Sequence, residues 1–293
     1  MPSSLLLRCA LALLSLAASS PALARDMRAG GKMLLTGGVS SVEGAAGGGL
    51  ATWSLIAGNE TKDGIGAKAH ITYLALPDFD LTTGGVAIGI KDRIELSYAR
   101  QRFDTRAAGA ALGLGRGFTF AQDIYGLKLR VIGDAVYDQD KLLPQISIGV
   151  QHKRANRGAV IRAIGGRHAS GTDFYVAATK VLLSHSLVLD ATLRVTKANQ
   201  LGLLGFGGDR RDAYRPQFEG SAGVLLARNL LVGAEFRTRP SNLGFAREQH
   251  GADLFAAWSL SKNVALTAAY ADLGDIATVR KQRGLFLSLQ GSL

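Results

Sequence analysis

One stretch of the 293-residue sequence carries the residue types that nucleophilic hydrolysis requires. His168 precedes Ser170 by two residues, and Asp173 follows shortly afterwards. His185 also stands between two serines, but so short a turn cannot bring a serine, a histidine and an acid within mutual hydrogen-bond distance. No G-x-S-x-G nucleophile motif is present. We therefore expect no enzyme, and keep a lipid hydrolase that uses His168 and Ser170 as an alternative.

Charged and imidazole side chains recur at every second position of otherwise apolar stretches. This period of two places them on one face of β-strands, opposite an apolar face. The residues predicted to share the inward face are Lys68, His70, Glu95, Lys128, Arg130, Asp190, Arg194, Glu219 and Glu235. Side chains of both signs can line a water-filled passage and set its ion preference. They can also pair across a narrow interior and seal it, so both possibilities stay open.

A group of arginines falls within one segment that contains no acid. The group consists of Arg154, Arg157, Arg162 and Arg167. Guanidinium groups pair well with phosphate, so this segment is predicted either to contact lipopolysaccharide or to be a solvated basic loop. The formal net charge of +11 could also suggest nucleic acid. We expect no nucleic-acid partner, because the basic residues are spread over several loops and no recognition motif is visible.

The sequence gives no reason to expect a cofactor. None of the five histidines stands at metal-ligand spacing from another histidine or an acid. The glycine-rich residues 113–117 and 205–208 lack the Lys-Ser/Thr ending of a phosphate-binding loop. Cys9 is the single cysteine, which excludes a disulfide scaffold. No metal and no other cofactor is therefore predicted.

The first 24 residues have the pattern of a secretory signal peptide. Arg8 precedes a short apolar run, and Ala22 and Ala24 supply the small residues of a cleavage site. The run is too short for a membrane-spanning helix. We predict cleavage after Ala24, so that Cys9 leaves with the signal peptide and the mature protein is exported.

The remaining sequence alternates with period two rather than with the period of a helix. In residues 187–195, five apolar residues face one side and mostly polar ones the other. Short connectors also alternate with long segments, namely 103–122, 154–171, 197–216, 239–251 and 272–284. Short turns at one rim and long loops at the other are typical of a transmembrane barrel. The long segments hold fifteen Lys and Arg against six Asp and Glu, which makes the long-loop rim basic.

Large aromatic residues recur near the long-loop ends of the expected strands. They are Trp53, Tyr73, Tyr125, Phe174, Phe218, Phe236 and Tyr270. Placed on the apolar face, they would form a girdle at the level of the lipid headgroups.

The fold class that follows is all-β, a transmembrane antiparallel β-barrel of about 14 strands after a cleaved signal peptide. Residues 50–293 supply thirteen candidate strands, the first over residues 50–58. Bacterial single-chain barrels have an even strand number, so residues 33–42 would supply the fourteenth. A pair of glycines interrupts that stretch. Residues 25–49, with their glycine-rich part at 44–49, could instead form a plug, which would leave 12 strands.

Several stretches of the sequence resemble a family of uncharacterised predicted outer-membrane β-barrels of Gram-negative bacteria, a domain of unknown function. They are residues 34–41, 44–49, 99–104, 133–140, 170–175, 202–209 and 273–276. The resemblance spans nearly the whole chain after the signal peptide. It implies a barrel in the bacterial outer membrane, but no substrate and no site.

The function predicted from the sequence is passive passage of a small solute through an outer-membrane barrel. The expected partners are membrane lipid, lipopolysaccharide, the barrel assembly machinery and the solute. The alternative is a sealed barrel with a structural or lipopolysaccharide-binding role. These possibilities differ in whether the interior is open, which the sequence leaves undecided.

Overall fold

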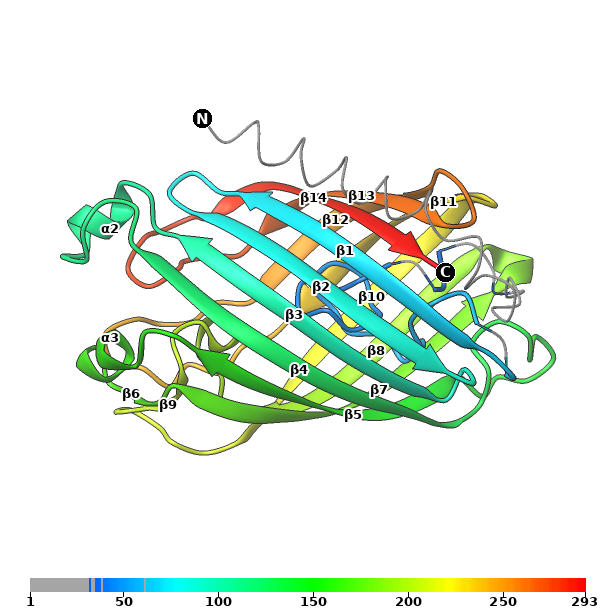
Figure 1. Cartoon of the computed structure of the whole chain (residues 1–293), viewed down its shortest axis with the longest axis horizontal. Coiled ribbons are helices and arrows are strands. Elements are labelled where there is room, and N and C mark those ends of the chain that lie inside the picture. Colours follow the sequence, from blue (N-terminus) through cyan, green and yellow to red (C-terminus); the bar gives the residue numbers. More distant parts are fainter. Residues whose placement is uncertain (1–31, 33–34, 38, 61) are drawn as a thin grey trace.

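The computed structural model describes residues 32, 35–37, 39–60 and 62–293, most of which form one β-barrel (Figure 1). The predicted signal peptide, residues 1–24, lies outside the described residues. The twelve barrel strands are β1 (Ile65–Ala75), β2 (Asp80–Ile90), β3 (Ile94–Asp104), β4 (Thr119–Ile132), β5 (Gln145–Ala155), β7 (Ser170–Leu182), β8 (Leu187–Thr196), β10 (Arg215–Ala227), β11 (Leu230–Arg237), β12 (Gly251–Ser259), β13 (Val264–Asp272) and β14 (Arg283–Ser292). Within the described part of the chain, no helix has the length and apolar character that crossing a membrane requires.

The barrel closes through antiparallel pairing of its first and last strands. Lys68 of β1 lies opposite Ser292 of β14, and the pairing continues to Ala75 opposite Leu285. Because every strand then has two neighbours, no row of backbone N–H and C=O groups is left unpaired at an edge. This is the arrangement that lets strands cross a hydrocarbon layer.

The two rims of the barrel differ as the connector lengths predicted. Tight turns such as η2 (Leu183–His185) join strands at one rim, which we call the short-turn rim. Long loops lie at the other, the long-loop rim, on the left in Figure 1. These loops contain α2 (Ala108–Ala111), α3 (Gly158–Ala163), η3 (Gln200–Gly202) and a small sheet of β6 (Gly166–His168) with β9 (Phe206–Gly208). Residues 133–144, between β4 and β5, form a longer connection on the short-turn rim.

The predicted alternation is confirmed along the strands, with apolar side chains outward and polar ones inward. On β8, Leu193 is 53% exposed on the outer surface, whereas the neighbouring Arg194 is 1% exposed inside. The outward aromatic residues Tyr125, Phe174, Phe218, Phe236 and Tyr270 are likewise exposed.

Trp53 is a correction to the predicted aromatic girdle. It lies inside the barrel, 3% exposed, and its indole N–H donates to Oγ of Ser221 at 2.9 Å. Its residue type suits a headgroup girdle, but its backbone is not part of the barrel wall.

The strand count of 14 is wrong, and the alternative count of 12 is correct. Residues 50–58 form no strand, and the described part of residues 33–42 has only a single bridge, from Ser40 to Ala46. The barrel therefore begins at Ile65 rather than at residue 50. The physical reason is that inward-pointing side chains of the wall, rather than a neighbouring strand, bind much of the backbone of residues 39–60.

Residues 39–60 lie inside the barrel, and we call them the lumen segment (Figure 1). Every residue from 39 to 58 is buried, including the glycine-rich part at 44–49. Glycine is needed at Gly47, where a Cβ atom would lie 2.3 Å from the carbonyl oxygen of Ala51. The segment therefore folds back on itself more tightly than a chain with larger side chains could.

Candidate functional site in the barrel lumen

Two carboxylates of the wall hold the lumen segment by its backbone N–H groups. Oε2 of Glu235 accepts hydrogen bonds from the N–H groups of Gly49 and Leu50, both at 2.6 Å. Glu95, on the far side of the barrel, accepts from Ala46 at 3.2 Å and from Ala57 at 2.9 Å. Charged acceptors make stronger hydrogen bonds than neutral ones, so these contacts fix where the backbone runs.

Two lysines of the wall hold the carbonyl oxygens of the same segment. Nζ of Lys68 donates to the carbonyl of Val39 at 2.7 Å. Nζ of Lys128 donates to the carbonyl of Leu55 at 2.8 Å and pairs with Glu95 at 3.2 Å. Carboxylates of the wall therefore bind N–H groups of the lumen segment, and lysines of the wall bind its carbonyl groups.

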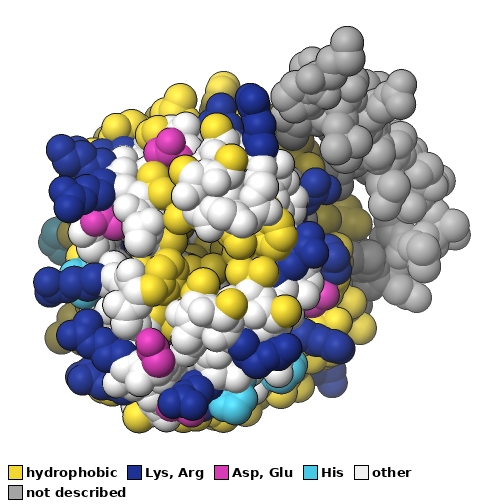
Figure 2. Space-filling model, turned by 90° about the vertical axis from the view of Figure 1, so that its left-hand side faces the viewer, with side chains coloured by type: hydrophobic (Ala, Val, Ile, Leu, Met, Phe, Trp, Pro, Cys, Tyr) yellow, Lys and Arg dark blue, Asp and Glu magenta, His cyan; other side chains and the backbone are white. Residues whose placement is uncertain are grey.

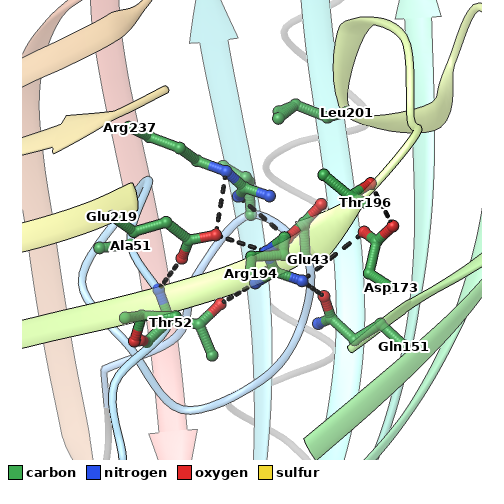
Figure 3. Close-up of polar contacts among 12 residues, drawn as sticks. Glu43, Ala51, Thr52, Gln151, Asp173, Arg194, Thr196, Leu201, Glu219 and Arg237 are labelled. Carbon is green, nitrogen blue, oxygen red and sulfur yellow. Dashed lines mark hydrogen bonds and ion pairs between the residues drawn. The ribbon is translucent and has the colours of Figure 1, made fainter. Parts of the chain in front are cut away.

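A cluster of six buried charges joins the lumen segment to five strands of the wall, β5, β7, β8, β10 and β11 (Figure 3). Glu43 of the lumen segment pairs with Lys153, with Arg194 at 3.6 Å and with Arg237 at 2.9 Å. The other two acids of the cluster are Asp173, 2.7 Å from Lys153, and Glu219, 3.2 Å from Arg237. Glu219 also accepts the N–H of Thr52 at 2.9 Å. We call these six residues the lumen charge cluster.

The lumen charge cluster is balanced, with three acids against three bases. Removing one member of such a buried set leaves an uncompensated charge and is strongly unfavourable. Glu43 is the one member that belongs to the lumen segment rather than to the wall. Moving the segment out of the barrel would therefore leave three cations facing two carboxylates, unless water or ions enter.

The other residues predicted to face inward, His70, Arg130 and Asp190, are also buried, but the side-chain hydrogen bonds and ion pairs of Arg130 and Asp190 are with the wall and its turns. Asp190 accepts a hydrogen bond from Thr179 at 2.5 Å. Both ring nitrogens of His70 are buried without a hydrogen-bond partner among the described residues. Arg130 lies at the short-turn rim, where it pairs with Asp92 and, at 2.9 Å, with Asp134.

Of the six cluster residues, only Arg194 and Glu219 were among those predicted from the sequence to face inward. The other four were not. Three of the missing ones, Lys153, Asp173 and Arg237, continue the same inward alternation by one or two steps along β5, β7 and β11. Extending the period-two pattern to the strand ends would have found them. Glu43 lies outside any strand, so no periodicity points to it.

The basic segment lies at the long-loop rim, as its position in a long connector predicted. Arg154, Arg157, Arg162 and Arg167 are all exposed. The guanidinium of Arg157 stacks over the ring of Phe118, with 4.6 Å to the centroid.

The structure does not bring together the three residues of the hydrolase alternative. Asp173 points into the barrel, where it pairs with Lys153 at 2.7 Å and accepts from Thr196. His168 is exposed instead, and Asp212 lies 3.8 Å from its Nε2. Asp173 therefore cannot orient His168 as the acid of a triad orients its histidine.

An apolar exterior, a closed antiparallel wall and a charged interior define an outer-membrane β-barrel of the porin-like class. The chain belongs to the family described as "Protein of unknown function (DUF3034)", whose model matches residues 36–290. No curated protein matches it.

Two solved porin structures are similar in fold. The KdgM porin in complex with disordered oligogalacturonate has a TM-score of 0.50 at 8% identity, covering 77% of this chain and 99% of that one. The NanC porin has a TM-score of 0.51 at 8% identity, covering 78% of this chain and 100% of that one. At such low identity the similarity shows the fold alone, and it is a fold that outer-membrane porins use.

Proposed function

We propose that this protein is an outer-membrane channel for a small solute and that the lumen segment closes it. The observation that carries the proposal is how the segment is held. Ion pairs and hydrogen bonds from polar side chains of the wall hold its backbone and its one carboxylate of the charge cluster, as at Glu43, Glu95 and Glu235. Water can replace such contacts, so the wall that remains after the segment moves is suited to a hydrated passage.

The alternative is a sealed barrel in which the segment is a permanent filling. The balance of the lumen charge cluster is compatible with it, because paired charges also stabilise a closed interior. Twelve strands, however, enclose more space than wall side chains alone occupy here, and a separate segment of chain fills it. Because the strands of the closed wall pair with one another and not with the lumen segment, the segment can leave without unfolding the barrel.

The proposal assigns roles to the rim and to the predicted partners. The exposed Arg154, Arg157, Arg162 and Arg167 are suited to the phosphates of lipopolysaccharide. The closed antiparallel wall is the kind of product that the barrel assembly machinery inserts. No reaction is included, because His168 and Asp173 face different environments.

The test is single-channel conductance in a planar bilayer with a salt gradient, using the folded chain without residues 1–24, the predicted signal peptide. A reversible lock supplies the control. Oγ of Ser147 lies 2.6 Å from the carbonyl oxygen of Ser54, so cysteines at both positions are near enough to be joined through a short bifunctional thiol reagent that a reductant cleaves. The lock ties the lumen segment to β5.

We expect discrete openings from the wild type and from the reduced Ser54→Cys/Ser147→Cys variant, and none from the locked form. Conductance that persists unchanged in the locked form would show that ions do not pass where the segment lies. Silence from folded wild type and from the reduced variant would favour the sealed barrel.

A further inference from the structure

The inward face of the wall changes from polar to apolar near the long-loop rim. Inward residues of five adjacent strands lie side by side in register there, and all are large and apolar. They are Phe286 of β14, Leu74 of β1, Leu81 of β2, Phe103 of β3 and Phe120 of β4. Each is at most 8% exposed. A passage for strongly polar solutes gains nothing from such a belt, because apolar walls do not replace hydration.

The long loops fold over this belt and leave a cavity of about 220 Å³. We call it the mouth pocket, the space between Leu74, Leu81, Phe103, Phe120, Leu203 and Ile276. Figure 2 shows the long-loop face, with an apolar hollow near its centre and Lys and Arg side chains around it. The cavity is smaller than the roughly 300–1,000 Å³ of sites for drug-sized ligands, so its occupant is small.

One charged side chain lines this apolar cavity. Arg239, 8% exposed, donates from Nη1 to Oε1 of Gln200 at 3.1 Å and from Nε to the carbonyl of Gln249 at 2.8 Å. Its third hydrogen bond, to the carbonyl of Leu273 at 2.5 Å, is also to a neutral acceptor. The two remaining guanidinium N–H groups have no acceptor among the described residues, so Arg239 can still bind an anion.

The nearest carboxylate makes no hydrogen bond with the guanidinium group of Arg239. Oε2 of Glu248 is 3.9 Å from Nε of Arg239, beyond hydrogen-bond distance, and has no hydrogen-bond partner among the described residues. Burial is the main cause that raises the pKa of Glu248 to about 7, with Arg239 opposing it. A partly protonated Glu248 leaves the charge of Arg239 available to a ligand.

The floor of the pocket is held in a strained conformation. Gln200 and Leu201 of η3 have φ values of 44° and 60°, which residues other than glycine rarely adopt. Glu248 accepts the N–H of Gln200 at 2.7 Å, and Arg239 binds its side chain. Local strain of this kind persists only where surrounding contacts enforce it, and it gathers at ligand sites.

We propose that the mouth pocket binds a small apolar carboxylate, with its hydrocarbon part against the phenylalanine and leucine belt and its carboxylate on Arg239. The basic long-loop rim attracts anions toward the pocket. Only one part of this proposal rests on the proposed function, namely that the bound carboxylate is also the transported solute. Binding itself requires no open channel.

The experiment measures binding calorimetrically, with the full folded chain in amphipol and decanoate as the probe. Decanol, which has the same chain but no charge, is the matched control ligand. Arg239→Gln removes the proposed anion partner, and Arg239→Lys keeps the charge. Thr278→Trp places a large ring in the pocket from an exposed loop residue, so it blocks the cavity without altering the barrel wall.

We expect decanoate to bind wild type, and Arg239→Gln to weaken it about 10- to 100-fold, as loss of a charged hydrogen bond does. Arg239→Lys should retain most of the affinity, decanol should be insensitive to both changes, and Thr278→Trp should abolish binding of both ligands. Unchanged binding in Thr278→Trp, or equal losses of decanoate and decanol in Arg239→Gln, would overturn the assignment. Conductance without decanoate binding would refute this inference alone, whereas binding without conductance would refute the channel alone.

Discussion

The carbonyl oxygen of Leu201 lies 3.3 Å from Nζ of Lys153, and the same ammonium group pairs with Glu43. Leu201 belongs to η3 in a loop of the long-loop rim, whereas Glu43 belongs to the lumen segment. One buried lysine of the wall therefore contacts both the floor of the mouth pocket and the segment that fills the barrel. A ligand that shifts η3 would change how Lys153 holds Glu43.

Glu43→Gln should release the lumen segment. The variant removes the negative charge that faces Lys153, Arg194 and Arg237, so the cluster keeps three cations and only two acids. Breaking a buried ion pair from one side typically costs about 3–5 kcal/mol. We expect a lower free energy of unfolding in urea and a higher open probability in planar bilayers.

Asp138→Asn is the matched control for this change. Its partner Lys141 is 3.5 Å away and exposed, and Asp138 itself is partly exposed, so the pair contributes at most about 1 kcal/mol. Openings should be as frequent as in wild type. Equal gating in Glu43→Gln and wild type would show that Glu43 does not retain the segment.

Gly47→Ala should disturb the fold of the lumen segment while sparing the barrel. The added Cβ would lie 2.3 Å from the carbonyl oxygen of Ala51, a backbone atom that side-chain rotation cannot move. Gly84→Ala on β2 is the control, since its nearest atom is 3.9 Å away. We expect faster proteolysis within residues 39–60 of folded Gly47→Ala, with no change in Gly84→Ala. Identical proteolysis patterns would contradict the tight fold of the segment.

The barrel wall was predictable from sequence because each strand carries its own evidence. Alternation such as Leu193 outward and Arg194 inward reflects lipid on one side and a polar interior on the other, and every wall strand repeats it. The same rule, extended to the ends of the strands, reaches Lys153 and Arg237.

The lumen segment was only partly predictable, for a physical reason. Trp53 and its neighbours are apolar enough to resemble a strand, yet their backbone is bound by side chains that lie far away in the sequence, such as Glu235. Local pattern contains no information about such long-range partners. The mouth pocket could not be predicted from the sequence for the same reason. Leu74, Phe103 and Phe120 become neighbours only through strand register.

Glu248 should give the stability of the long-loop rim a specific pH dependence. Its folded pKa of about 7 exceeds the ordinary 4.5, so the folded state binds the proton more tightly. The resulting stabilisation is complete below pH 4.5 and is lost as the pH rises to about 7. Relative to Glu248→Gln, which mimics the protonated acid, wild type should lose up to about 3 kcal/mol over this range in urea unfolding. Parallel pH profiles for the two proteins would contradict the assignment.

The arginines of the basic segment should bind the phosphates of lipopolysaccharide. Changing Arg154, Arg157, Arg162 and Arg167 together to Gln removes four exposed guanidinium groups from one segment of the chain. Exposed ion pairs contribute about 0.2–1 kcal/mol each, so we expect affinity for lipopolysaccharide at low salt to fall roughly 10- to 100-fold. Dephosphorylated lipopolysaccharide should bind both proteins equally weakly, because guanidinium pairs with phosphate.

The matched control removes the same number of charges at the short-turn rim, by changing the exposed Lys62, Lys91, Arg93 and Arg228 to Gln. This variant has the same net charge as the first but an intact basic segment. If position decides, only the long-loop variant loses affinity. If both variants lose affinity equally, net charge alone accounts for the binding, and the basic segment is a solvated loop without a dedicated partner.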